Sequence, residues 1–85
     1  MKKVQLIKTK INTDNSTEEP HITPFEKFES ARVQMQCEFL FEEENAISHG
    51  NVEEEGWTLH NIDTNSAAIQ PARSYGYKWE IKELV

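Results

Sequence analysis

The sequence predicts one small α+β domain over residues 1–85, in the order β-α-β-β-β, with one helix packed on one face of an antiparallel sheet. A central segment carries apolar residues at three- and four-residue steps, the spacing of an amphipathic helix. The segments on either side of it are rich in β-prone residues. The links between the last three of these segments are short, which favours an antiparallel meander.

The N-terminal part predicts a strand followed by a loop. Lys3 to Ile11 contains the β-prone residues Val4, Leu6, Ile7 and Thr9. Asn12 to Pro20 contains no apolar residue, so we expect a polar loop over residues 12–22.

Residues 25–44 are expected to form the helix. Thr23 can cap it, Pro24 suits the first helical position, and Glu26 completes a capping box. Gly50 offers a stop. The expected buried face carries Phe28, Ala31, Met35 and Phe39, extended by Phe25 and Ala46.

An opposing pattern lies inside this segment. Val33, Met35, Cys37, Phe39 and Phe41 occupy alternate positions, as in a strand. We prefer the helix because good helix formers dominate the segment and no turn signal interrupts it.

The C-terminal third predicts three strands, over residues 57–62, 67–70 and 75–82, separated by turn residues. The last strand alternates cleanly and places its large side chains on one face: Tyr75, Tyr77, Trp79 and Ile81. We expect this face, and both tryptophans, to form the core beneath the helix.

The composition indicates a cytoplasmic protein. Cys37 is the only cysteine, so no intrachain disulfide can form, and a disulfide-free secreted domain of this size is unusual. The basic start resembles that of a signal peptide, but Lys8 and Lys10 interrupt its apolar run. No stretch has the length of a membrane span.

No catalytic, cofactor-binding or metal-binding motif stands out, so we expect a protein that is not an enzyme and has no cofactor. The histidines His21, His49 and His60 have no recognised ligand spacing with one another or with the single cysteine. Cys37 sits within the expected helix, and we expect it to be a buried core thiol.

Charge is unevenly distributed in this chain of net charge −6. Val33 to Ala72 contains no Lys or Arg, which disfavours direct nucleic-acid binding because phosphate contacts need cations. An acidic face suits a basic partner, or it serves solubility alone. The candidate partner-binding residues are Glu42, Glu43, Glu44, Glu53, Glu54 and Glu55.

The chain resembles short proteins encoded by phages and mobile elements, some of them anti-CRISPR proteins. The resemblance is one of layout and composition. It rests on a first strand, the segment Thr-Pro-Phe-Glu-Lys-Phe-Glu-Ser-Ala at residues 23–31, Gly-Trp-Thr-Leu at 56–59 and Tyr-Lys-Trp-Glu-Ile at 77–81. It implies an accessory factor that inhibits or modulates a host protein, and it assigns no role to any single residue.

Three functions therefore stay open. The first is a non-enzymatic binding protein whose acidic span engages a basic host protein. The second is a small enzyme or ligand-binding domain with a pocket between helix and sheet. The third is a homodimeric structural module, joined through a sheet edge or the helix. Segregated charge and the lack of catalytic motifs favour the first.

Reversing Glu53, Glu54 and Glu55 to Lys should slow association with a basic partner while leaving the fold intact. Exposed charges are screened over ~8–10 Å at ordinary ionic strength and act mainly on the association rate. Association rates across a salt series test this prediction. Equal rates for the two proteins and a flat salt dependence would contradict it and leave solubility as the reason for the acids.

Overall fold

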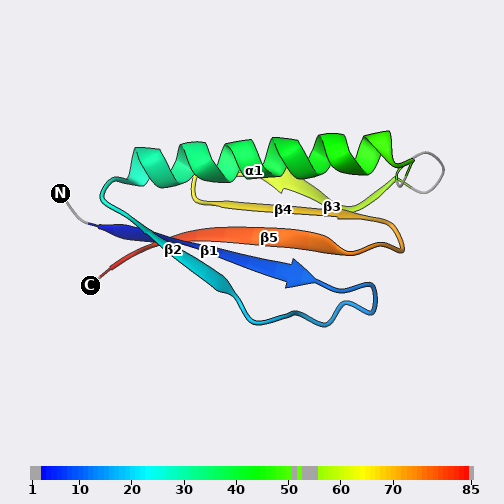
Figure 1. The fold of residues 1–85 in the computed structure, drawn as a ribbon, viewed down its shortest axis with the longest axis horizontal. Helices are drawn as coiled ribbons and strands as arrows, with labels where there is room; N and C mark the ends of the chain where they lie inside the picture. The colour runs from blue at the N-terminus through cyan, green and yellow to red at the C-terminus, as the bar shows by residue number, and fades with distance from the viewer. Residues whose placement is uncertain (1–2, 51, 53–55, 85) are drawn as a thin grey trace.

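A computed structural model describes residues 3–50, 52 and 56–84 of the chain as a helix lying on one face of a sheet (Figure 1). The sheet has five strands in the spatial order β2-β1-β5-β4-β3, and every neighbouring pair is antiparallel. The elements are β1 (Val4–Ile11), β2 (His21–Phe25), α1 (Phe28–Ser48), β3 (Trp57–Ile62), β4 (Ser66–Pro71) and β5 (Gly76–Glu83). The α+β fold class predicted from the sequence is confirmed.

The sheet contains one strand that the sequence did not predict. β2 pairs with β1 and forms one edge of the sheet, so the polar connection between them is shorter than the predicted loop over 12–22. Thr23 lies opposite Leu6 and Pro24 lies opposite Gln5 in this pair. Proline has no backbone N–H to donate. Pro24 is tolerated in β2 because one side of an edge strand makes no hydrogen bonds to a neighbouring strand.

The predicted capping box is therefore wrong. Thr23 and Pro24 belong to β2, and the helix begins at Phe28 after Lys27, which makes no side-chain capping hydrogen bond. Pairing with β1 overrides the local signal for a helix start, because it gives backbone groups on one side of this edge strand their hydrogen-bond partners. The helical assignment of the Val33–Phe41 segment is nevertheless confirmed, and the strand alternative is wrong.

The core lies between the inner face of α1 and the sheet. The predicted buried stripe is confirmed, because Ala31, Met35, Phe39 and Ala46 are all buried. Phe25 at the end of β2 and Phe28 at the beginning of α1 pack against the core. The sheet contributes these buried residues to the same cluster: Val4, Leu6, Ala67, Ile69, Trp79 and Ile81.

Trp79 is the largest side chain at the centre of this core and only 2% of its surface is exposed. Its ring meets the edge of Phe39, with 6.2 Å between ring centroids. Trp57 is half-buried and packs against the same cluster from the opposite edge strand. The prediction that the tryptophans serve the core is confirmed for Trp79, while Trp57 borders it.

Gly76 allows the beginning of β5 to approach β4 closely. A Cβ atom added at this position would collide with the backbone of Ile69 and Gln70. The close approach brings the segment before β5, including Tyr75, beneath the C-terminal half of α1.

Trp79→Ala should lower the free energy of unfolding by ~3–5 kcal/mol, because truncation of a buried aromatic leaves a cavity that the core cannot fill. Tyr75→Ala is the matched control, since Tyr75 is an aromatic of the same face with 40% of its surface exposed. Denaturant unfolding of both variants gives the comparison. An unchanged free energy of unfolding for Trp79→Ala would show that the core is not organised around this ring.

Candidate functional site

The outer face of α1 carries a stripe of large apolar side chains that nothing in the described chain covers. The exposed fractions are 58% for Val33, 57% for Leu40, 66% for Phe41 and 55% for Ile47. Isolated exposed apolar residues are ordinary, but a contiguous group on one face marks an interaction site more often than chance.

The stripe follows a regular helical seam. Val33, Cys37, Leu40, Glu44 and Ile47 recur at alternating steps of four and three residues, so they lie along one line of the helix surface. Phe41 flanks this line. In a helix of 3.6 residues per turn, the seam points away from the buried face that begins at Ala31. The helix is thus apolar on two opposite sides, which explains why the segment also shows strand-like alternation.

Cys37 is exposed within this seam. The expectation that it is a buried core thiol is wrong. The buried positions of α1 fall on the opposite side of the helix, and Cys37 follows Val33 by one turn on the outer face. The thiol is accessible to reagents, which makes it a natural reporter for anything that covers the stripe.

The predicted acidic residues of α1 do not lie on one face. Glu44 is exposed in the outer seam, whereas Glu42 and Glu43 are half-buried on different flanks of the helix. Glu42 faces Tyr77 of β5, and Glu43 contacts His60 of β3. Glu53, Glu54 and Glu55 lie outside the described residues.

On the β3 flank, Glu43 joins an aromatic cluster. Its carboxylate lies within hydrogen-bonding contact of His60 Nε2. The His60 ring stacks on Trp57, with 4.6 Å between centroids, and lies 5.5 Å from the Phe39 ring. These contacts tie the edge strand to the helix and give Glu43 a structural role.

On the opposite flank, Glu38 is held by three donors. Lys8 Nζ lies 3.1 Å from Glu38 Oε1, and Trp79 Nε1 donates to the same oxygen over 3.3 Å. Gln34 donates to Oε2 over 2.6 Å. Burial by itself would raise the pKa of Glu38, but its donors outweigh that effect and hold the pKa below the usual value.

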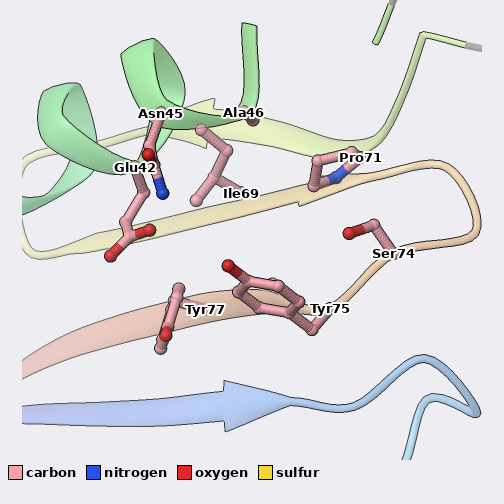
Figure 2. A pocket seen from close by; sticks show the side chains of 9 residues that line it. Glu42, Asn45, Ala46, Ile69, Pro71, Ser74, Tyr75 and Tyr77 are labelled. Atoms are coloured by element: carbon pink, nitrogen blue, oxygen red, sulfur yellow. The ribbon is translucent and has the colours of Figure 1, made fainter. Parts of the chain in front are cut away.

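A narrow cleft opens beside this cluster, between the C-terminal half of α1 and the β4–β5 connection (Figure 2). Glu42 and Asn45 extend into it from the helix, and Tyr75 and Tyr77 face them from the sheet side (Figure 2). Ser74 lies at one end, and the apolar part of the lining comes from Ala46, Ile69, Pro71 and Gly76. A pocket between helix and sheet was one of the three possibilities left open by the sequence, but no motif located it, because its two sides are separated by about thirty positions in the chain.

Glu42 is the only carboxylate among the residues that line the cleft. Partial burial raises the pKa of Glu42, the positive charge of Lys8 opposes that rise, and the nearby Glu38 carboxylate adds to it. Burial also raises the pKa of Tyr77, and the Glu42 charge contributes in the same direction. The carboxylate therefore sits in a place where its negative charge is poorly compensated.

The described residues include no group of three His, Cys, Asp or Glu side chains that could hold a metal ion. No helix in the same part of the chain is long and apolar enough to cross a membrane. Comparison of the chain with family models, with curated proteins and with solved structures gives no match. The candidate sites are therefore the apolar outer face of α1 and the cleft beside the helix.

Glu42→Gln should stabilise the protein at neutral pH. Because the folded pKa of Glu42 is raised, the stability that this carboxyl contributes is fully present below its unfolded pKa and is lost as the pH rises through the folded pKa. The variant should match the wild type near about pH 3 and exceed it near about pH 7, by ~0.5 kcal/mol or less for a partly exposed group.

Glu38→Gln is the control, because the contribution of Glu38 to stability should have the opposite pH dependence. The pKa of Glu38 is lowered, so its stabilising contribution exists above the unfolded pKa and is lost as the pH falls through the folded pKa. Thermal unfolding of the three proteins across this pH range provides the measurement. A Glu42→Gln variant that is less stable than the wild type at neutral pH would contradict the assignment of Glu42 as a poorly compensated carboxylate.

Proposed function

We propose that this chain is a non-enzymatic binding protein that docks the outer face of α1 against another protein. The observation that carries the proposal is the exposed seam formed by Val33, Leu40 and Ile47, with Phe41 beside it. A helix that is apolar on two sides is normally buried on both. The inner side of α1 is buried by the sheet, and docking would bury the outer side.

Charge favours a basic partner as the occupant of this face. α1 carries five carboxylates and one cation, Arg32, and no Lys or Arg occurs from Val33 to Ala72. A second copy of the chain would bring Glu44 and its acidic surroundings against the same charges, which is unfavourable. The partner that fits is an apolar groove with Lys or Arg at its rim, the arrangement in which amphipathic helices commonly bind.

The two kinds of residue have different roles in this docking. The apolar side chains supply most of the affinity, because buried anchors at the centre of an interface dominate binding energy. Glu44 and the other exposed acids speed association and orient the helix. A factor of this kind would inhibit or modulate a host protein, the role that the resemblance to phage and mobile-element proteins implies.

Leu40→Glu should weaken binding to the partner by about tenfold or more, the effect of losing one interface anchor. The substitution also adds a negative charge to the face, which by itself would favour a basic partner. A loss of affinity would therefore come from the lost apolar contact and not from the change in charge. Ile22→Glu is the matched control, because Ile22 has 52% of its surface exposed and is three positions before Phe25, which packs on the core, so strand alternation places Ile22 on the sheet face away from α1. Both variants should keep the wild-type melting temperature.

A photo-reactive label attached to Cys37 captures the partner in a host-cell lysate. The partner is then identified and purified, and its affinity for the wild type and both variants is measured. Support requires a basic groove on that protein, loss of affinity with Leu40→Glu alone, and weakening by salt. Equal binding of Leu40→Glu and the wild type would overturn the proposal. A crosslink between two copies of this chain, with no other protein captured, would assign the outer face to a homodimer and remove the basic partner.

A further inference from the structure

The cleft beside α1 contains a carboxylate without a direct partner. Within the described chain, no hydrogen bond or close ion pair reaches the Glu42 carboxylate, although it is half-buried. The neighbouring carboxylate, Glu38, has its own cation in Lys8. Glu42 points into the space between the helix and the two tyrosines (Figure 2).

The tyrosines make the cleft attractive to cations. Tyr75 and Tyr77 meet edge to face, with 6.0 Å between centroids, and both rings line the cleft. Each ring already has a lysine of β1 near it: Lys8 Nζ lies 4.6 Å from the centre of Tyr77, and Lys10 Nζ lies 5.0 Å from the centre of Tyr75. Aromatic faces attract ammonium groups through the ring quadrupole.

Neither lysine near the cleft forms an ion pair with Glu42. Lys8 is paired with Glu38 at 3.1 Å, and Lys10 lies 3.9 Å from Glu18. Lys8 acts on Glu42 only as a nearby charge. A further cation that entered the cleft could make the direct contact with Glu42 that Lys8 does not make.

The size of the cleft restricts the cation. Its volume of about 20 Å³ has room for a single water-sized group, which needs ~10–15 Å³ of such space. A primary ammonium group has this size. A planar guanidinium and a quaternary ammonium are larger and fit this space less well.

We propose that the cleft binds a primary ammonium group, with Glu42 as its counter-ion and the oxygens of Asn45 and Tyr75 as hydrogen-bond acceptors. The source is a lysine side chain at the rim of the basic partner, and in this respect the inference rests on the proposed function. Phe41 lies one helical turn before Asn45, which lines the cleft, so Phe41 lies on the flank of α1 nearest to the cleft. A partner that covers Phe41 is thereby placed to extend a lysine to Glu42.

The test uses the isolated chain and small probes, followed by NMR. n-Butylammonium and the blocked tripeptide acetyl-Gly-Lys-Gly-amide should each produce saturable shifts at Tyr77 and at the Glu42 carboxyl carbon. n-Propylguanidinium should bind several-fold more weakly because of its size. Glu42→Gln should weaken ammonium binding by about tenfold or more, the order expected when one partner of a partly buried charge pair is removed.

Glu80→Gln is the matched control, because it makes the same chemical change on β5, where Glu80 pairs with the exposed Lys82. It should bind both probes as the wild type does. Tighter binding of the tripeptide than of n-butylammonium would support a protein lysine as the source, and equal binding would support recognition of the ammonium alone. The absence of saturable shifts, or equal affinity of Glu42→Gln and the wild type, would overturn the proposal.

The result is independent of the test of the proposed function. The probes are too small to bridge the cleft and the outer seam, so their binding reports on Glu42 and the tyrosines only. A failed titration together with Leu40-dependent partner binding would remove the ammonium site and keep the docking face. Successful titration, together with partner binding that does not depend on Leu40, would keep the ammonium site and remove the docking face.

Discussion

The packing of α1 against Trp79 is the interaction on which the rest of the structure depends. Trp79 is buried beneath the helix, contacts the edge of Phe39, and donates from its indole N–H to Glu38. These contacts fix both the position of the helix and its rotation about its own axis. The apolar outer seam then faces solvent, and the flank that carries Glu42 faces β5.

This arrangement places competing demands on one helix. The inner positions must satisfy a small core, because a domain of this size has little stability to lose. The outer positions do not contribute to that core, since Leu40 and Phe41 are mostly exposed. Their apolar character has no stabilising role in the isolated chain, and it is explained if another protein buries them. Glu42, which has no direct partner among the described residues, is explained in the same way by a cation from outside.

The sequence predicted the helix and its buried face because Ala31, Met35 and Phe39 repeat with the helical period. It misplaced the helix start because a local capping signal was overruled by strand pairing that involves residues distant in the chain. It misplaced Cys37 because apolar residues occur on both faces of the helix, and periodicity alone does not say which face meets the sheet. A pocket between helix and sheet was expected only as an alternative, and its residues could not be predicted, because the β4–β5 connection brings Tyr75 to the cleft from a distant part of the chain.

The alkylation rate of Cys37 tests the docking face most directly, because the thiol lies within the seam and is exposed in the isolated chain. The rate is measured over a range of chain concentrations and then with saturating purified partner. If a basic partner covers the outer face, the rate should not depend on chain concentration and should fall sharply when the partner is bound. A rate that falls as the chain is concentrated, or one that the bound partner leaves unchanged, would contradict it.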